Sequence, residues 1–355
     1  MSAVSAIDLL RDLENNRFGF FRQLKTVADI MTPKVMTLSV DQRVRDARQL
    51  FEKHPIRHAP LIDPENNEVL GIVSDRDLIR HMPRYLGTLV EGDNDHRALT
   101  TSLSQIMTRK PVRAQRETPL LEAVSLMLDN HIDCLLVYEK PTEIQGIVTT
   151  HDFLKMVLLY YRFCVRSDGS LVRLRLMDLE RRLSAEEIFL HGGQTVRDVM
   201  TREVVTLTPD HTIGDALPLM QEKFVRHVPM VDAKNNLVGV LSDRDLLRAL
   251  GPASRQATSA DNNGNKFRGN LFAIEENDPA LKERLSSVMK LKVTTVRSDS
   301  RFSEAVRLFV EQRISCLPVT DDSSRVLGIV TRADVMRLFR VVLRLAAFTE
   351  QPQGV

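Results

Sequence analysis

The chain has 355 residues, of which 43% are apolar, and it carries a formal net charge of +2. This length favours two domains over a single core, and the near-balanced charge argues against the extended basic surface that binds nucleic acid or anionic membranes. Three cysteines are too few for a disulfide framework, and no apolar run approaches the roughly 20 residues that span a bilayer, so we expect a cytoplasmic protein without a membrane segment.

A predicted N-terminal helix at residues 1–19 is followed by four repeats, which we call units 1 to 4. In each unit an alanine lies 16 residues after a methionine, and a glycine lies 23 or 24 residues after that alanine. The only difference in length falls in a polar turn, so the constant register indicates true repeats. The anchors are Met31, Ala47 and Gly71; Met107, Ala123 and Gly146; Met200, Ala216 and Gly239; and Met289, Ala305 and Gly328.

Within each unit the pattern predicts a strand, a helix, two more strands and a second helix. A short β-prone run follows the methionine, and a helix with apolar residues at i, i+3, i+4 and i+7 comes next, as at Leu120, Ala123, Val124 and Met127. The two later strands enclose a polar turn, and a hydroxyl residue after the second of them opens the last helix. Four such β-α-β-β-α units give an α+β fold class.

The units alternate in type, which predicts two tandem pairs. Units 1 and 3 share R-H-x-P and S-D-R-D-L, whereas units 2 and 4 share I-x-C-L and G-I-V-T, so an A-B pair has been duplicated. The predicted boundaries are 24–84 and 100–165 for units 1 and 2 within a first pair at 20–165, a connector helix at 166–190, 193–251 and 282–345 for units 3 and 4 within a second pair at 191–345, a mobile insertion at 252–266 and a tail at 346–355.

One motif recurs in all four units, and we call it the hydroxyl–acid motif. It reads glycine, two apolar residues, serine or threonine, two further residues and aspartate. A hydroxyl followed three residues later by an acid at a helix start is also a capping box, which stabilises the helix without binding any ligand. The pairs are Ser74 and Asp77, Thr149 and Asp152, Ser242 and Asp245, and Thr331 and Asp334.

The chain resembles the cystathionine-β-synthase (CBS) domain family over roughly 280 residues, which include all four units. The resemblance is carried by the openings at 27–32 and 196–201, by R-H-x-P at the start of a strand, and by the hydroxyl–acid motif. It implies that two units pair about a pseudo-twofold axis and that adenosine-containing ligands bind in the clefts between them.

The resemblance also implies roles for individual residues. The hydroxyl residues of the motif would contact ribose or phosphate, and the aspartates would accept hydrogen bonds from the two ribose hydroxyls, as an ionised carboxylate can. Units 2 and 4 have Asp133 and Ser315 near the place of the R-H pair, and His151 replaces an arginine, so we expect uneven occupancy. The candidate phosphate contacts are Arg57, His58, Arg76, Arg226, His227, Arg244 and Arg332.

The sequence holds no recognisable catalytic or metal-binding motif outside these repeats. We therefore expect a non-catalytic regulatory sensor, with no cofactor, that binds AMP-, ADP- or ATP-like nucleotides and relays this to an unknown protein partner or to an oligomeric state such as a homodimer. The alternative is an interaction scaffold whose clefts stay empty and whose motifs act only as helix caps.

Overall fold

The computed structural model describes residues 25–82, 93–140, 143–164, 195–250 and 278–349. The predicted N-terminal helix, the connector helix and the predicted insertion at 252–266 lie outside these residues. The last helix runs to Thr349, so it extends past the end predicted for unit 4 at residue 345.

The two units of the first pair contain the predicted strands and helices, and further short elements lie in the link between the units. Unit 1 and the link to unit 2 contain η1 (Val27–Asp29), β1 (Leu38–Ser39), α3 (Val44–Lys53), β2 (His58–Ile62), β3 (Val69–Ser74), α4 (Asp75–His81), α5 (Asp93–Leu99), α6 (Leu103–Ile106) and β4 (Thr108–Arg109). Unit 2 contains β5 (Arg113–Gln115), α7 (Leu120–Asp129), β6 (Cys134–Lys140), β7 (Glu143–Thr149) and α8 (Thr150–Cys164).

The second pair repeats the order of elements within the units, but the described residues of unit 3 form no first strand, and the link of this pair has η3 and η4 where the first pair has α5, α6 and β4. Unit 3 contains η2 (Val196–Asp198), α10 (Ile213–Glu222), β8 (His227–Val231), β9 (Leu237–Ser242) and α11 (Asp243–Leu250). The link and unit 4 contain η3 (Pro279–Lys282), η4 (Leu285–Ser287), β10 (Val296–Arg297), α12 (Phe302–Glu311), β11 (Cys316–Thr320), β12 (Val326–Thr331) and α13 (Arg332–Thr349). The first strand predicted for unit 3 is reduced to a single parallel bridge between Leu207 and Met230, so that prediction was wrong in extent although the pairing is retained.

Each unit is built on an antiparallel hairpin with a helix on either side of it in the chain. In unit 1, β1 runs parallel to β2 and β2 runs antiparallel to β3, and the other units repeat these pairings where the first strand is present. The predicted helix positions are buried, with Leu120, Ala123, Val124 and Met127 at most 2% exposed. The α+β fold of four β-α-β-β-α units is therefore confirmed.

The opening segment of each unit packs on the other member of its pair. The backbone of Thr32 exchanges hydrogen bonds of 2.8 and 3.0 Å with Ile147 of unit 2, and β4 in turn pairs with β3 of unit 1. A Cβ atom added to Gly146 would lie 2.8 Å from Sδ of Met31, and one on Gly71 would lie 2.5 Å from Sδ of Met107. The methionine and the glycine of the repeat therefore meet across the pair and not within one unit.

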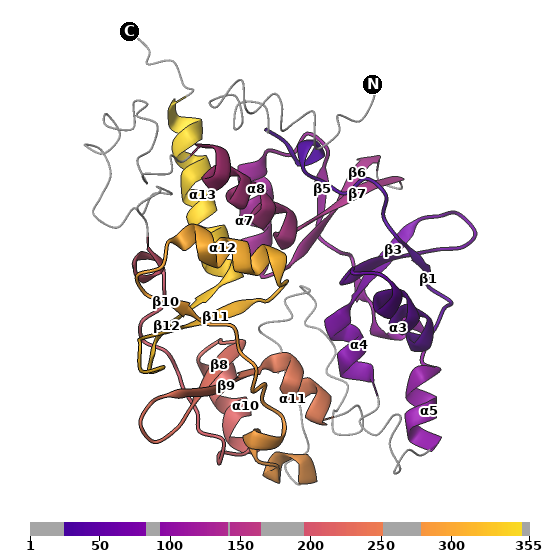
Figure 1. Cartoon of the computed structure of the whole chain (residues 1–355). Helices are drawn as coiled ribbons and strands as arrows, with labels where there is room; N and C mark the ends of the chain where they lie inside the picture. Colours follow the sequence, from indigo (N-terminus) through magenta and orange to yellow (C-terminus); the bar gives the residue numbers. More distant parts are fainter. Residues whose placement is uncertain (1–24, 83–92, 141–142, 165–194, 251–277, 350–355) are drawn as a thin grey trace.

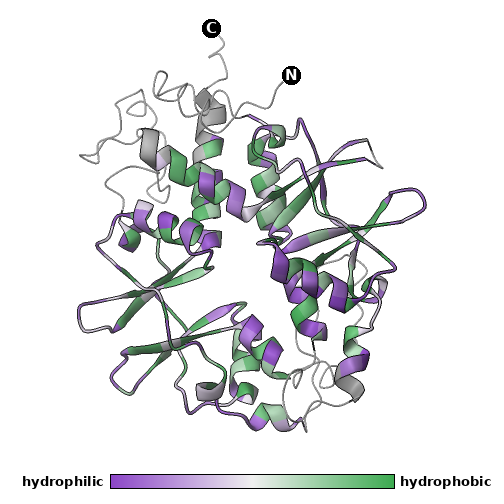
Figure 2. Ribbon diagram, turned by 45° about the vertical axis from the view of Figure 1, so that its right-hand side comes forward, coloured by the Kyte–Doolittle hydropathy of each residue, from purple (hydrophilic) through white to green (hydrophobic). Residues whose placement is uncertain are grey.

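The four units surround a common centre, as Figure 1 shows with unit 2 at the top, unit 1 at the right, unit 3 below and unit 4 at the left. Units 2 and 4 meet through α7, α8, α12 and α13, which share one apolar core. Units 1 and 3 meet through α4 and α11, where Ile79 packs on the core of unit 3. Figure 2 shows the apolar sides of the helices turned toward the sheets and toward one another. Among the described residues, no helix combines the length and the apolar character that crossing a membrane requires.

Candidate nucleotide site

Each hydroxyl–acid motif closes the N-terminus of the second helix of its unit. The hydroxyl residue ends the strand. Its backbone N–H and its hydroxyl group both donate hydrogen bonds to Oδ2 of the aspartate. This arrangement satisfies donors that a helix start leaves unpaired. The N to Oδ2 distances are 2.9 Å for Ser74 and Asp77, 2.9 Å for Thr149 and Asp152, 3.0 Å for Ser242 and Asp245, and 2.8 Å for Thr331 and Asp334. The acid half of the predicted capping box is thus present in all four units.

The second carboxylate oxygen has a different environment. Oδ1 of Asp152, Asp245 and Asp334 faces the basic side chain one turn later, at 3.3 Å from Lys155, 3.2 Å from Arg248 and 2.6 Å from Arg337. These lysine and arginine side chains are more than half exposed, whereas the carboxylates are largely buried. Buried carboxylates need such partners, and an exposed cation can turn away. Oδ1 is therefore the oxygen that a ribose hydroxyl could reach without breaking the cap.

The same backbone hydrogen bond connects the motif, in each of the four units, to the residue that precedes the central strand of that unit. The residue after the motif hydroxyl donates its N–H to the carbonyl oxygen of that preceding residue in every unit. The distances are 2.9 Å from Asp75 to Arg57, 3.0 Å from Thr150 to Asp133, 3.0 Å from Asp243 to Arg226, and 3.2 Å from Arg332 to Ser315. Whatever stands before the strand therefore lies beside the start of the second helix.

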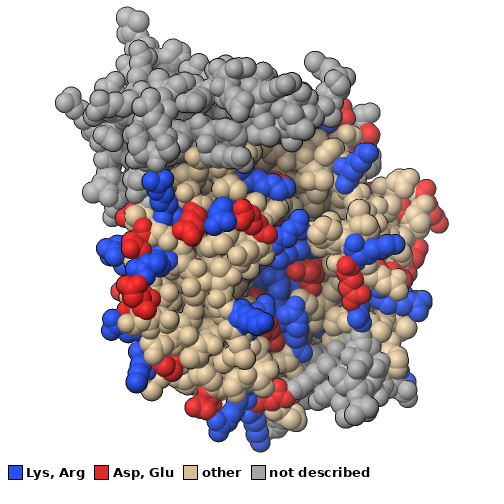
Figure 3. All heavy atoms as spheres, in the orientation of Figure 1, with Lys and Arg blue, Asp and Glu red and all other residues tan. Residues whose placement is uncertain are grey.

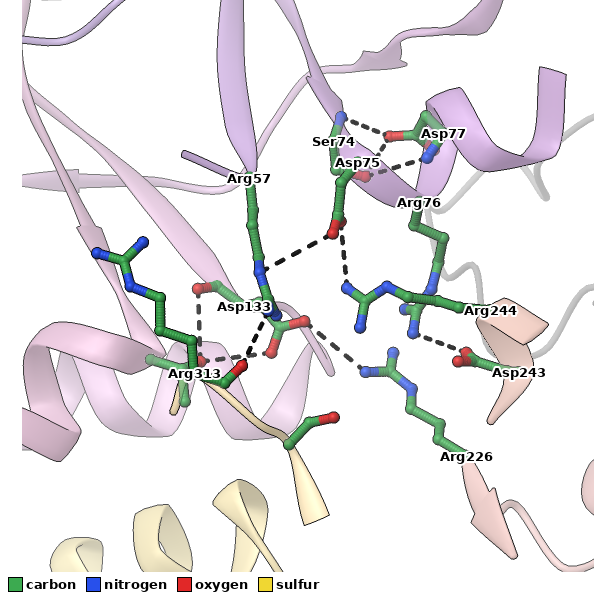
Figure 4. Close-up of polar contacts among 12 residues, drawn as sticks. Arg57, Ser74, Asp75, Arg76, Asp77, Asp133, Arg226, Asp243, Arg244 and Arg313 are labelled. Atoms are coloured by element: carbon green, nitrogen blue, oxygen red, sulfur yellow. Dashed lines mark hydrogen bonds and ion pairs between the residues drawn. The ribbon is translucent and has the colours of Figure 1, made fainter. Parts of the chain in front are cut away.

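Units 1 and 3 are joined at these helix starts by two reciprocal ion pairs. Nη2 of Arg76 lies 2.7 Å from Asp243, and Nη2 of Arg244 lies 3.1 Å from Asp75 (Figure 4). Both ion pairs use the aspartate and the arginine in the middle of S-D-R-D. Each of the two motifs therefore supplies one acceptor and one donor to the other unit. The side chain of Arg76 is 17% exposed and that of Asp243 is 4% exposed, which places this ion pair inside the interface.

The remaining strand-start residues meet across the centre. Nη2 of Arg57 donates to the carbonyl of Arg313 at 3.0 Å, and Nη1 of Arg313 donates back to the carbonyl of Pro55 at 2.6 Å. Arg226 of unit 3 lies 3.8 Å from the carboxylate of Asp133 in unit 2. Figure 4 shows these side chains converging from all four units, and Figure 3 shows basic and acidic side chains together in the middle of the face that it views. We call this group the central cluster: Arg57, Asp75, Arg76, Asp133, Arg226, Asp243, Arg244 and Arg313.

The central cluster contains more positive than negative charge. Burial, followed by repulsion from Arg76, lowers the pKa of Arg226 to about 10, and burial together with Arg244 lowers the pKa of Arg57. Burial also lowers the pKa of His227 to about 4, so this imidazole is neutral at pH 7 and adds no charge. An anion placed here would relieve the repulsion between the guanidinium groups.

Two buried donors of the cluster lack acceptors. Nε of Arg76 and Nε of Arg244 are buried and make no hydrogen bond to the residues that the structure describes. A buried N–H of a charged group without an acceptor is costly, and a phosphate oxygen is an acceptor that guanidinium groups bind well. These two atoms come from equivalent positions in units 1 and 3.

The predicted phosphate contacts meet in one place. The R-H pairs of units 1 and 3 and the arginines of S-D-R-D lie in or beside the central cluster. Arg332 of unit 4 also lies beside it: burial, followed by repulsion from Arg57, lowers its pKa to about 10, and its Nε donates to the carbonyl of Ile314 at 2.6 Å. Sequence reasoning missed Arg313 as a member, as well as the ion-pairing role of Asp75 and Asp243. The repeated D-R dipeptide in units 1 and 3 was the signal that could have revealed those ion pairs.

Comparison with known proteins agrees with the repeat structure. The family model described as "CBS domain" matches residues 27–84, 103–159, 196–252 and 285–341, more than half of the chain. Protein MJ1225 of Methanocaldococcus jannaschii is 21% identical over 313 residues, covering 86% of this chain and 95% of that protein. Its crystal structure, described as that of a proposed archaeal homologue of g-AMPK, superposes with a TM-score of 0.59 over 88% of this chain and 99% of that one.

Two further relatives match a stretch of this chain about as long as one pair of units. CBSX2 of Arabidopsis thaliana is 32% identical over 153 residues, covering 41% of this chain and 64% of that protein; a crystal structure of CBSX2 in complex with AMP has a TM-score of 0.32 at 29% identity, over 43% of this chain and 99% of that one. The inosine-5′-monophosphate dehydrogenase of M. jannaschii is 28% identical over 162 residues, covering 45% of this chain but only 27% of that enzyme. The chain therefore belongs to the CBS domain family, with four CBS domains in two tandem pairs.

Proposed function

We propose that the chain is a regulatory, non-catalytic sensor that binds adenine nucleotides between its paired CBS domains. The observation that carries this proposal is the placement of the hydroxyl–acid motifs of units 1 and 3 at helix starts beside a cluster rich in arginine, where two buried Nε donors have no acceptor among the described residues. The sequence relative CBSX2 has been described in complex with AMP, which supports adenine nucleotide as the class of ligand.

The chemistry of the site suits a nucleoside phosphate. Oδ1 of Asp77 or Asp245 would accept hydrogen bonds from the ribose hydroxyls while Oδ2 keeps the helix cap. The N-termini of α4 and α11 attract an anion, and Arg76 and Arg244 would hold the phosphate together with the R-H pairs. By the same proposal, Thr149 and Asp152 of unit 2 and Thr331 and Asp334 of unit 4 would hold the ribose in the other two units.

The regulatory step follows from competition for the arginines. A phosphate that attracts Arg76 and Arg244 competes with Asp243 and Asp75, the carboxylates that join units 1 and 3. Ligand binding would thus change the interface between the two pairs, provided that the nucleotide binds one arrangement more tightly than the other. We also propose that a protein partner or a homodimer responds to this change. The cytoplasmic location expected from the cysteines belongs to the same proposal.

Calorimetry with AMP, ADP and ATP tests the sensor against the full chain and three variants. We expect saturable binding that is lost or strongly weakened in Asp77→Ala and Asp245→Ala. Asp215→Ala is the matched control, because Asp215 forms the same capping box with Thr212, at an N to Oδ2 distance of 2.8 Å, on the first helix of unit 3. Each variant should lose about 1 kcal/mol of folding free energy with its cap, but only Asp215→Ala should keep nucleotide binding.

The second candidate is an interaction scaffold whose motifs are caps alone. The observation that favours it is the cap contact to Oδ2, which residues of the unit itself form in all four units. For a scaffold, none of the three nucleotides would produce heat, and Asp245→Ala and Asp215→Ala would be equivalent in every measurement. That result would overturn the sensor.

A further inference from the structure

Unit 2 differs in charge from the other units at the point where its hydroxyl–acid motif meets the central cluster. We propose that its site takes an adenosine without a phosphate, and that Asp133 excludes the phosphorylated forms that units 1 and 3 accept. This inference rests on the proposed function, since it takes the motif of unit 2, Thr149 and Asp152, to hold the ribose.

Three positions surround the start of the second helix in every unit: the residue before the central strand and the first two residues of the helix. In units 1 and 3 these positions hold two arginines and one aspartate, which leaves a positive charge. In unit 4 they hold one arginine, and in unit 2 they hold an aspartate and no arginine. The sets are Arg57, Asp75 and Arg76; Asp133, Thr150 and His151; Arg226, Asp243 and Arg244; and Ser315, Arg332 and Ala333.

The carboxylate of Asp133 lies at the N-terminus of α8, where the helix dipole attracts an anion. The N–H of Thr150 donates to the backbone carbonyl of Asp133 at 3.0 Å, and the Thr150 hydroxyl donates to Oδ1 of the same residue at 3.4 Å. The chain therefore supplies its own anion at this helix start. A phosphate that followed the helix axis from Asp152 would approach a charge of the same sign.

Both titratable groups hold the charge state that this selection requires at pH 7. Burial raises the pKa of Asp133, but Arg226, His58, Arg76 and Arg244 outweigh it and leave the pKa below its usual value, so the carboxylate is ionised. His151 is the residue that replaces an arginine, and burial followed by repulsion from Lys155 lowers its pKa to about 4, so it is neutral. The arginine nearest to Asp133 is Arg226, at 3.8 Å, and it belongs to the strand start of unit 3.

The same carboxylate can recognise what AMP lacks. The 5′-hydroxyl of adenosine is a hydrogen-bond donor, and an ionised carboxylate is an acceptor only. Adenosine could therefore donate to Asp133 at the point where the phosphate of AMP would be repelled. Selection at unit 2 would then combine an attractive contact to one ligand with a repulsive contact to the other.

Adenosine and AMP, which differ only in the phosphate, form the test pair for calorimetry on the full chain. For the wild type we expect one equivalent of adenosine that AMP does not displace. Asp133→Ser, which installs the residue that unit 4 has at this position, should strengthen AMP binding at this site by at least about tenfold, because a unit charge close to the phosphate is removed. Asp210→Ser, the same substitution at an aspartate whose side chain is 81% exposed, should leave AMP binding unchanged.

Two outcomes would overturn the inference alone. In one, Asp133→Ser binds AMP and adenosine as the wild type does. In the other, the gain in AMP binding persists after Asp152→Ala is added to Asp133→Ser, which would assign the gain to release of Arg226 in unit 3. Thermal melting of both variants confirms that they fold. If the wild type binds neither ligand, the proposed function itself fails and this inference fails with it.

Discussion

The aspartate of the hydroxyl–acid motif illustrates how one residue can serve stability and recognition together. Its Oδ2 closes the helix start, and its Oδ1 faces exposed cations in units 2, 3 and 4, with both Arg248 and Lys290 beside Asp245. The sequence predicted the pairing of hydroxyl and acid because three residues separate them at a helix start, which is a local matter. The sequence left the choice between a helix cap and a ligand contact open, because both use the same residues. They differ only in whether Oδ2 or Oδ1 of the aspartate accepts the hydrogen bond.

The histidine of the R-H pair in unit 3 makes the folded chain sensitive to acid. The pKa of His227 is about 4 in the folded chain, where burial is the largest cause, and it is near 6.5 in an unfolded one. Between these values the unfolded chain binds more protons, so the free energy of unfolding falls as the pH falls. Urea unfolding at pH 7.5 and 5.5 should show a loss of about 1 kcal/mol from this residue.

His227→Gln separates this effect from other titrating groups. Glutamine can keep a hydrogen bond to Ser315, whose hydroxyl lies 2.8 Å from Nε2 of His227, but it does not titrate. We expect the variant to lose less stability than the wild type between the two pH values, with the remaining loss due to His58 and His151, whose pKa values burial also lowers. An equal loss in both proteins would show that His227 does not control this response.

At the scale of elements, the opening segment of each unit is exchanged between the members of a pair. The strands β2, β8 and β11 coincide with the short, mainly apolar segments predicted as strands, because a short apolar run between turns is a local signal. The contact between a methionine and a glycine of the partner unit had no local signal. The repeat spacing places a methionine and a glycine at the same positions in every unit. That spacing would be the same whether the two residues touch within one unit or across the pair.

Gly328→Ala tests this exchange. The new Cβ would lie 2.7 Å from Sδ of Met200 and 2.8 Å from the carbonyl oxygen of Thr201, so the backbone bridge between Thr201 and Ile329 must shift. We expect a loss of about 2 kcal/mol in the free energy of unfolding. Met200→Ala should restore only part of it, because the carbonyl remains.

Gly214→Ala is the matched control for that substitution. Gly214 lies in the first turn of α10, and a Cβ atom added to it would lie 3.1 Å from the carbonyl oxygen of Leu281. Alanine favours a helical position over glycine by roughly 0.5–1 kcal/mol. The two effects should nearly cancel, so stability measured by urea unfolding should hardly change. Equal losses in both variants would contradict a special role for the glycine of the repeat.

At the scale of the whole molecule, the alternation of unit types becomes an alternation of interfaces. Units 2 and 4 share a continuous apolar core, whereas units 1 and 3 are joined by reciprocal ion pairs beside a smaller apolar contact. The sequence predicted that units 1 and 3 are of one type and units 2 and 4 of another. Which unit meets which was not predictable, because that depends on packing between helices far apart in the chain.

Phe153→Ala tests the apolar interface. Phe153 and Phe339 are fully buried, with ring centroids 6.2 Å apart across units 2 and 4. Removing one ring should cost about 3–5 kcal/mol and should loosen the contact between the two pairs, which urea unfolding and small-angle scattering would detect. Phe224→Ala, at a phenylalanine that is 73% exposed, should change stability by less than about 0.5 kcal/mol. Similar effects of the two substitutions would contradict the shared core.

The central claim is that the hydroxyl–acid motifs hold the ribose of an adenine nucleotide whose phosphate lies at the central cluster. A crystal structure of the full chain grown with AMP measures this most directly. We predict nucleotide density in the first and second pairs, with the ribose hydroxyls within hydrogen-bonding distance of Oδ1 of Asp77 and Asp245 and the phosphate on Arg76 or Arg244. Nucleotide bound elsewhere, or motifs that contact no ligand in a crystal saturated with AMP, would contradict it.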